Sequence, residues 1–243
     1  MDVTCVYSAE QEDTGMKPIF RLDLEKALKS SSPVILELGS GIKETPGRIR
    51  IDKLDLPHTD IVADLEEGLA FLPDNSVDAV YSTSFLEHID NLDGLMKEIW
   101  RVLKPTGKQV LFVPHFSNPY THSDYTHRRS FGLYTFAYFS RDQKPFKRRV
   151  PSFYHDYGFT TEDITLVFAS PWRGRGLIKR IFQKVFNLNT WLKEFYEENL
   201  CYMMPCYGVQ ATLRPVKDQT LMARVGIQSP ADAPPDRLKE TVE

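Results

Sequence analysis

The sequence predicts an α/β fold built on a seven-stranded, mostly parallel sheet with helices on both faces. Short apolar runs bounded by Pro and Gly, such as residues 33–39, are typical of buried parallel strands. These runs are separated by connections of loop or helix length, as expected for a covered parallel sheet. The length of 243 residues, with 42% hydrophobic content, suits one such domain with additions.

The chain begins with an irregular arm and one short helix, which together occupy residues 1–32. Residues 18–30 carry apolar side chains near helical spacing, which predicts the helix. The N-terminal segment lacks a basic start followed by an apolar run, so we expect no signal peptide. No stretch approaches the roughly 18 apolar residues that a membrane-spanning helix needs. These features predict a cytoplasmic protein.

The predicted domain occupies residues 33–216 and contains all seven strands. Its first strand is the apolar run between Pro33 and Gly39, and similar runs bounded by turn residues follow it. The predicted strands are residues 34–38, 49–52, 60–64, 77–84, 108–116, 162–170 and 207–215.

Helices are predicted between several of these strands. Asp90 or Asn91 caps a helix whose apolar residues share one face, and Pro105 with Gly107 ends it. An insertion over about residues 173–203 separates the last two strands. The other predicted helical segments are residues 131–140 and, within that insertion, residues 176–187 and 190–200.

Cysteine content and charge restrict the function classes. Cys5, Cys201 and Cys206 are widely spread without a CxxC motif, which indicates a reduced compartment and neither disulfides nor a structural zinc site. Between residues 128 and 184, twelve Lys and Arg residues stand against four Asp and Glu residues. This stretch is either a solvated face or a region that attracts anionic ligands. Residues 217–243 are rich in Ala, Pro and charge, which predicts a disordered tail.

Two glycines directly follow the first predicted strand, at the edge where open α/β sheets bind ligands. Gly39 and Gly41 let a ligand approach the backbone closely. The position of a third glycine in a dinucleotide fingerprint holds Glu44, whose carboxylate would repel a diphosphate. Glu37, just before the glycines, suits a ligand with an ammonium group. The loop therefore favours a ligand with a cationic tail and no phosphate.

Carboxylates also end the second and third predicted strands. Asp52 is placed to accept hydrogen bonds from both hydroxyl groups of a ribose. Asp64 offers a polar group to an adenine amine, and Leu65 offers an apolar wall to its ring. Either aspartate alone can be a strand-end cap or a surface charge. Their occurrence at successive strand ends favours a nucleoside pocket.

A long run of the chain contains the motifs VILELGSG, RIRID, DIVADLEEGLAFLPDNSVDAVYSTSFLEHI and LMKEIWRVLKPTGKQVLFVPHFS. Over about residues 33–170 the chain resembles the class I methyltransferases, specifically the broad type 11 group. The resemblance implies a Rossmann-like sheet, S-adenosylmethionine as cofactor and methyltransferase activity. The residues that it assigns to the cofactor are Glu37, Gly39 and Gly41 at the methionine end, Asp52 at the ribose, Asp64 and Leu65 at adenine, and Ser84 with Phe85 after the fourth strand.

The first helix of the resembling family is shortened in this sequence. Gly39 and Asp52 are only 13 positions apart, whereas a full βαβ half needs about 20 residues. We therefore expect a turn around Pro46 and Gly47 in place of that helix. The methionine end of the pocket would then be more open than usual.

The loop after the fifth predicted strand holds the candidate catalytic residues. Methyl transfer from a sulfonium to a hydroxyl needs a positioned acceptor and a base. An imidazole suits that base at neutral pH. His115, at the strand end, is the first candidate, and His127, oriented by Asp124, is the second. The candidate acceptor-binding residues are Tyr120, His122, Tyr125, Arg128 and Arg129, with the arginines suited to a carboxylate or phosphate.

The histidines of this loop have two other interpretations. His115, His122, Asp124 and His127 have the side chains of metal ligands, but their spacing matches no familiar pattern, so we expect no metal. The imidazoles can instead hold the loop by bonding backbone carbonyls, which is the favoured interpretation for His122. His88, in the motif LEHI, is expected to be a pocket-wall or helix-start residue.

The motifs disfavour a nucleic-acid acceptor. The position of an NPPY-like motif after the fourth strand holds residues 82–85, and Pro205 with Cys206 lies far from the position of a cytosine-modifying nucleophile. No RNA-binding motif occurs. The loop instead resembles type 11 enzymes of surface-glycan and sugar modification. This implies O-methylation of a sugar hydroxyl in an anionic or lipid-linked glycan, and a place in polysaccharide biosynthesis.

Alternative functions share the same cofactor residues. A natural-product O-methyltransferase would have an apolar acceptor pocket rather than an arginine-lined one. A non-catalytic S-adenosylmethionine-binding or scaffold protein would bind the cofactor without turnover. The insertion at residues 173–200 mixes basic and large apolar side chains. It is either a helical lid over the sheet or a contact surface for a membrane or a glycosyltransferase.

Overall fold

The computed structural model describes residues 16–143, 146–152, 154–169, 174 and 176–218. Most of the predicted N-terminal arm and nearly all of the predicted disordered tail therefore lie outside the described residues. The same holds for positions 173 and 175 of the predicted insertion.

Nine strands form one mixed sheet in the order β1-β4-β3-β2-β5-β6-β9-β8-β7. Strand β9 runs antiparallel to both of its neighbours, and β1 runs antiparallel to β4. All other neighbouring strands are parallel. The strands are β1 (Ile19–Phe20), β2 (Ile35–Leu38), β3 (Ile49–Asp52), β4 (Ile61–Val62), β5 (Val77–Thr83), β6 (Leu103–Pro114), β7 (Ser140–Asp142), β8 (Phe159–Val167) and β9 (Gly208–Pro215).

The prediction of seven strands is wrong, because two short strands extend the sheet at its edges. Strand β1 pairs with β4 at one edge, and β7 pairs with β8 at the other. With only two and three residues, these strands are too short to show the alternation by which a strand is recognised. The seven inner strands lie within or across the predicted segments.

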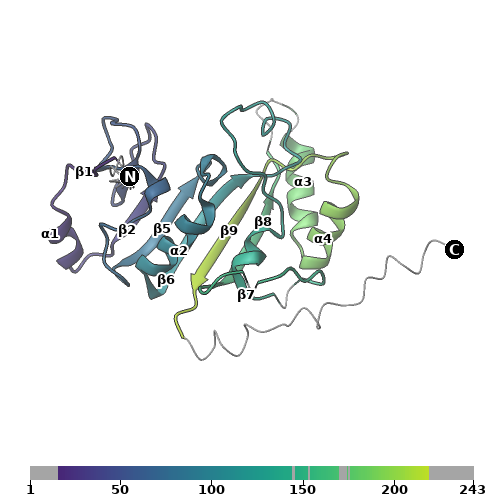
Figure 1. Cartoon of the computed structure of the whole chain (residues 1–243). Coiled ribbons are helices and arrows are strands. Elements are labelled where there is room, and N and C mark those ends of the chain that lie inside the picture. Colours follow the sequence, from purple (N-terminus) through teal and green to yellow (C-terminus); the bar gives the residue numbers. More distant parts are fainter. Residues whose placement is uncertain (1–15, 144–145, 153, 170–173, 175, 219–243) are drawn as a thin grey trace, which may run out of the picture.

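The helices are short and sit mainly between the later strands. In Figure 1, α3 and α4 lie side by side beyond β8, at the end of the molecule opposite β1 and α1. The predicted helix over 131–140 is a 3-10 helix followed by β7. The helical segments are α1 (Leu24–Lys29), η1 (Leu65–Glu67), η2 (Leu86–His88), α2 (Leu92–Val102), η3 (Thr135–Phe139), α3 (Gly176–Phe186) and α4 (Thr190–Asn199).

Helix α2 forms as its sequence predicts. Its apolar residues recur at helical spacing and are buried, and the Asn91 side chain caps the helix by accepting from Gly94 N at 3.1 Å. The helix ends at Val102, but strand β6 begins at once at Leu103 rather than at the predicted position 108. Pro105, read in the sequence as a helix terminator, is therefore part of a strand.

Only one face of strands β6, β8 and β9 is buried by the described residues. Leu111 and its partner Ala211 are buried beneath α2, whereas Phe112 is half-buried and its partner Gln210 is exposed. The expectation of helices on both faces of the sheet stays a prediction. In the other half of the sheet, the β2–β3 and β3–β4 connections, which are fully described, contain no helix.

None of the helices in the described ranges combines the length and the apolar character needed to cross a bilayer.

Candidate functional site

The glycine elbow after β2 lies at the carboxyl edge of the parallel strands. Gly39 and Gly41 both adopt left-handed backbone angles, with φ of +64° and +56°. A Cβ at position 39 would lie 2.3 Å from the Phe85 ring, whereas a Cβ at position 41 would meet nothing within 4 Å. Phe85 thus packs on the first glycine, and the backbone at the second is open to a ligand.

Glu37 is the buried carboxylate of the elbow. Its side chain belongs to a residue only 8% exposed, and its Oε2 atom has no hydrogen-bond partner. Arg48 approaches Oε1 at 3.7 Å and lies over the Tyr81 ring, 3.8 Å from the centroid. A buried carboxylate oxygen without a partner is costly, so this position fits a positively charged ligand group.

Asp52, predicted to bind a ribose, holds the elbow in place. Its Oδ2 atom accepts from Gly41 N at 2.8 Å, and its Oδ1 atom accepts from Leu54 N at 2.9 Å. The side chain therefore joins the end of β3 to the glycine loop after β2. Each carboxylate oxygen has a further lone pair, so these bonds leave acceptor capacity for a hydroxyl group.

Asp64 ends the β4 segment and caps η1. Its Oδ1 atom accepts from Glu66 N at 3.1 Å, and its Oδ2 atom pairs with Lys53 Nζ at 2.6 Å. Burial raises the pKa of Asp64, but the hydrogen bond from Lys53 and the backbone bond outweigh it, so the pKa lies below its usual range. Leu65 is buried in the hydrophobic core.

Ser84 follows β5 and lines a cavity beneath the loop after β6, residues 115–129, which we call the acceptor loop. It adopts a left-handed φ of +51°, and its backbone N–H donates to Phe112 O at 2.9 Å. Such a backbone angle is uncommon in a residue other than glycine. The adjoining cavity has a volume of about 200 Å³ and is lined by Ser84, Glu87, His88, Phe112, Pro114, Asn118, Tyr120, Thr121, Asp124, His127 and Tyr207.

His127 and Asp124 come together in this cavity, as the sequence predicts. The Nε2 atom of His127 lies 3.6 Å from Asp124 Oδ2, and its Nδ1 atom is buried without a hydrogen-bond partner. The His127 ring also packs edge-on against His88, with centroids 4.9 Å apart. This arrangement leaves one imidazole nitrogen unused inside the cavity wall.

Glu87 is a cavity residue that sequence reasoning missed. The residue is 1% exposed, and neither carboxylate oxygen has a hydrogen-bond partner on another residue. Burial, together with the charge of Asp124, raises the pKa of Glu87 to about 7. One sequence signal could have found it. The motif LEHI comes shortly after β5, near the strand end where ligands bind in such sheets.

His115, predicted to be the base, lies outside this cavity. Its side chain is fully buried, with Nδ1 2.8 Å from Ser117 Oγ and Nε2 3.1 Å from Glu197 Oε2. Glu197 also accepts from Leu133 N at 2.6 Å. His115 thus connects the end of β6 to α4 through hydrogen bonds at both ring nitrogens. A catalytic role for His115 stays a prediction.

The other predicted acceptor-binding residues do not all line this cavity. Tyr120 lines the cavity, whereas Tyr125 is 93% exposed. His122 Nε2 lies 3.1 Å from Phe116 O, which agrees with its interpretation as a loop-holding residue. Arg128 lies 3.8 Å from Asp90, on the surface.

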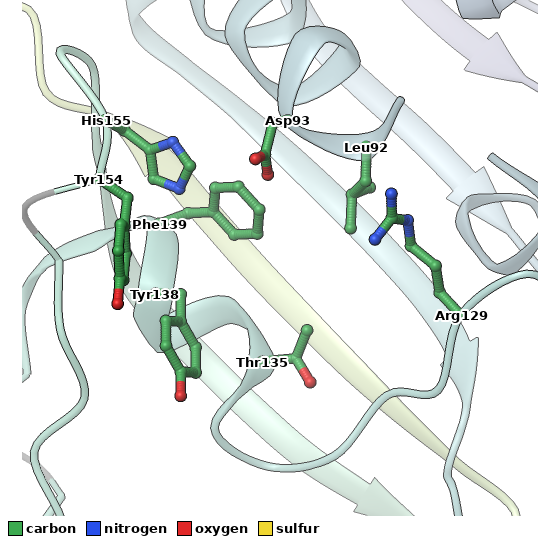
Figure 2. A pocket seen from close by; sticks show the side chains of 8 residues that line it. All are labelled: Leu92, Asp93, Arg129, Thr135, Tyr138, Phe139, Tyr154 and His155. Carbon is green, nitrogen blue, oxygen red and sulfur yellow. The ribbon is translucent and has the colours of Figure 1, made fainter. Parts of the chain in front are cut away.

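Arg129 faces a second cavity, of about 370 Å³, on the other side of the acceptor loop. Figure 2 shows its guanidinium beside Leu92, across the cavity from Phe139 and His155. The guanidinium donates to Ile89 O at 3.0 Å and also donates to Asp90 O. Arg128 and Arg129 therefore do not line the cavity that contains His127.

Comparisons with known proteins find relatives of part of the chain. The model of the methyltransferase domain family Methyltransf_11 matches residues 41–111. The chain carries an S-adenosylmethionine-dependent methyltransferase domain. A segment of 57 residues is 42% identical to the sterol 24-C-methyltransferase of Aspergillus fumigatus, covering 24% of this chain and 15% of that enzyme. The matched segment thus spans only a small part of the length of this relative.

Solved structures of methyltransferases are also similar to this methyltransferase domain. One is an S-adenosylmethionine-dependent methyltransferase from Archaeoglobus fulgidus, with 16% identity, a TM-score of 0.46 and coverage of 76% of this chain and 87% of that chain. Another is a Haemonchus contortus phosphoethanolamine N-methyltransferase, with 19% identity, a TM-score of 0.42 and coverage of 80% and 51%.

The elbow of the methyltransferase domain fits this cofactor. S-adenosylmethionine carries an ammonium and a sulfonium but no phosphate. The unpartnered Oε2 atom of buried Glu37 suits the ammonium, and the open space at Gly41 lets a ligand reach the backbone.

Proposed function

We propose that the chain transfers a methyl group from S-adenosylmethionine to a hydroxyl group bound in the cavity beneath the acceptor loop. The observation that carries this proposal is the position of that cavity. It adjoins Ser84, at the end of the strand next to the glycine elbow, and its wall contains His127 with an unused buried nitrogen. These two features support a proton acceptor beside the position where a bound hydroxyl would meet a methyl donor.

The proposed cofactor residues are those that the sequence indicates. Glu37 would bind the ammonium group, and the backbone at Gly39 and Gly41 would lie against the methionine part. Asp52 would accept from the ribose hydroxyls while it holds Gly41 N. The remaining proposed contacts are Asp64 and Leu65 at adenine, and Ser84 and Phe85 between the cofactor and the acceptor.

When bound, S-adenosylmethionine supplies an activated methyl group on a sulfonium, which leaves as a thioether when the acceptor oxygen bonds the methyl carbon. His127 removes the hydroxyl proton. Asp124, 3.6 Å from His127 Nε2, favours the tautomer with the proton on Nε2, so Nδ1 accepts. We place the base at His127 rather than His115 because both nitrogens of His115 are engaged within the protein.

A sugar hydroxyl of an anionic or lipid-linked glycan is the first candidate acceptor. The basic stretch over residues 128–184 supports an anionic molecule. A natural-product hydroxyl is a second candidate, favoured by a specific observation. The cavity wall contains Phe112, Pro114, Tyr120 and Tyr207, and no arginine occurs among its described lining residues.

Labelled S-adenosylmethionine tests the proposed function and its two candidate acceptors. The full chain is incubated with glycan and nucleotide-sugar pools, and separately with a panel of small hydroxylated molecules. We expect a product whose mass increases by one methyl group in one of these pools. Cofactor binding without any methylated product in either pool would instead support a non-catalytic cofactor-binding protein.

The helical insertion supports contact with an anionic membrane surface. Leu177, Ile181 and Val185 recur at helical spacing on α3 and are 68%, 52% and 40% exposed. Arg180 and Lys184 lie on the same helix. Sedimentation with anionic lipid vesicles tests this contact. Ile181→Asp should reduce binding, whereas Leu54→Asp, at an exposed residue of the β3–β4 loop, should not.

A further inference from the structure

Three metal-ligating side chains meet in the wall of the acceptor cavity. Glu87 and His88 belong to η2, and His127 comes from the loop 39 positions later. One possible donor atom from each residue lies within 4.8 Å of the other two. A backbone hydrogen bond holds the two segments together, because Arg128 N donates to Glu87 O at 2.7 Å.

The donor atoms of this cluster are unused. Glu87 is 1% exposed, and neither of its carboxylate oxygens bonds another residue. His127 Nδ1 is likewise buried without a partner. A buried carboxylate normally has a paired cation or several hydrogen bonds. The side chain of Arg128, whose backbone N–H bonds Glu87 O, is directed to Asp90 at 3.8 Å. Nothing in the described residues thus satisfies Glu87.

The opposite sides of both imidazoles are held by polar groups. His88 Nδ1 lies 3.0 Å from Thr126 Oγ1, and Thr126 Oγ1 donates to Asp124 Oδ1 at 2.6 Å. The other oxygen of Asp124 lies 3.6 Å from His127 Nε2. Such outer contacts orient metal-bound histidines and fix their tautomers. They leave Nε2 of His88 and Nδ1 of His127 as donors.

We propose that Glu87, His88 and His127 bind one divalent first-row metal ion and leave a coordination position open toward the cavity. Two imidazoles and one carboxylate are a donor set that zinc and iron use when a site keeps an open position. This set shares His127 with the loop residues for which the sequence led us to expect no metal, and it adds Glu87 and His88, which lie about 39 positions earlier in the chain. Metal binding itself does not depend on the proposed function.

The catalytic use of the metal does rest on the proposed function. The acceptor hydroxyl would bind the open position, where the positive charge of the metal lowers the pKa of that hydroxyl. Its proton would pass to the Asp124 carboxylate, which lines the same cavity. The acceptor oxygen would then bond the methyl carbon, and the electrons of the carbon–sulfur bond would remain on sulfur. With metal present, His127 would act as a ligand and not as the base.

Equilibrium dialysis of Zn²⁺ against the full chain, followed by elemental analysis, tests the site. We expect one ion per chain in the unchanged protein and loss of that ion in Glu87→Gln, His88→Ala and His127→Ala. Thr126→Ala, which removes an outer contact, should weaken affinity by about 10–100-fold. The matched control is His58→Ala, which removes an imidazole outside the cavity and should retain the ion.

Absence of bound Zn²⁺ in the unchanged chain would overturn the proposal, as would full retention in all three ligand variants. Circular dichroism of each variant shows whether it is folded. Co²⁺ substitution gives a second measurement, because its visible spectrum reports imidazole and carboxylate ligation and should change in Glu87→Gln, which preserves the size of the side chain.

Separate measurements distinguish this site from the methyltransferase function. Calorimetry with S-adenosylmethionine on chelator-treated protein tests the cofactor pocket alone. If cofactor binds and methyl transfer stops on chelation but returns with added metal, the catalytic use is supported. Unchanged transfer in metal-free protein would overturn that use and leave the proposed function intact. Failure to bind cofactor would refute the proposed function without affecting the dialysis result.

Discussion

Two histidines of the acceptor loop differ in their surroundings, although the sequence predicts both as candidate general bases. His115 is fully buried, and its ring nitrogens contact Ser117 and Glu197. His127 lines the cavity and keeps one nitrogen without a partner. The difference arises because His115 still follows the inward side of β6, whereas His127 follows the turns after that strand. Tertiary packing, which spacing does not reveal, decides which imidazole can reach a substrate.

His127→Ala tests the role of the cavity imidazole. We expect turnover to fall by about 100-fold or more, because the cavity loses its base or, in the metal-bound protein, a metal ligand, while S-adenosylmethionine affinity is unchanged. Steady-state kinetics and calorimetry measure the two effects. His58→Ala, outside the cavity, is the control and should leave both unchanged. Normal turnover in His127→Ala would contradict the assignment.

His115→Ala tests the alternative that this residue is structural. Removing its ring takes one hydrogen-bond partner from Ser117 and one from Glu197 in a buried setting, which should cost about 1–3 kcal/mol of unfolding free energy. Chemical denaturation measures the loss. His122→Ala, which removes an imidazole bonded to one backbone carbonyl, is expected to cost less. A variant with unchanged stability and abolished turnover would instead favour His115 as the base.

At the scale of secondary structure, one ion-pair network fastens α2 to the segment after η1. Arg101 donates to Leu69 O at 3.0 Å and to Leu72 O at 2.9 Å, and it pairs with Glu98 at 2.8 Å. Glu98 in turn accepts from Leu69 N at 3.2 Å. The hydrogen bond from Arg101 lowers the pKa of Glu98, and this effect exceeds the opposing effect of burial.

Glu98→Gln should therefore change how stability depends on pH. Since the pKa of Glu98 is lower in the folded state, its contribution is present above its ordinary pKa of 4.5 and is lost as the pH falls through the folded value. We expect the variant to be less stable by about 1 kcal/mol at pH 7. The difference should shrink on acidification. Urea denaturation at several pH values measures it, and a constant difference would contradict the expectation.

The elements that the sequence predicted well are those with a long periodic pattern. Helix α2 was identified by its apolar spacing and by a cap at Asp90 or Asn91; the helix is confirmed, and Asn91 is the capping residue. Strand β6 was placed too late, because Pro105 and Gly107 are strong terminators in a sequence. In the structure they lie in the first part of the strand, whose pairing with β5 is irregular between Val77 and Ala79. The short strands β1 and β7 have too few residues to form any pattern.

Across the whole molecule, the proximity of the proposed cofactor residues was easier to predict than the shape of the acceptor cavity. Glu37, Gly39 and Asp52 are placed by consecutive parallel strands, whose carboxyl ends must meet at one edge. The acceptor cavity instead depends on how η2 meets a loop distant in the chain. Glu87 was missed because a glutamate at the start of a helical turn usually faces solvent, and its burial results from contacts that are not local.

Cofactor binding should stabilise the whole chain. At a concentration 100 times the dissociation constant, S-adenosylhomocysteine should add about 2.7 kcal/mol to the free energy of unfolding, which raises Tm by roughly 5–10 °C. Asp52→Ala, which frees Gly41 N, should reduce this shift severely. Thermal unfolding with and without ligand measures it. The absence of any shift in the unchanged protein would refute the cofactor assignment.

The contact between Gly39 and Phe85 has a consequence for how this sequence can evolve. Any side chain at position 39 would overlap the ring, in addition to facing an unfavourable backbone angle. The neighbouring Gly41 has empty space around it within the protein, so replacement there is resisted by its backbone angle and, in the proposed function, by the cofactor that would fill that space. Position 41 can therefore vary without disturbing the packing of the protein but not without affecting the cofactor, whereas a change at position 39 also requires a compensating change at position 85.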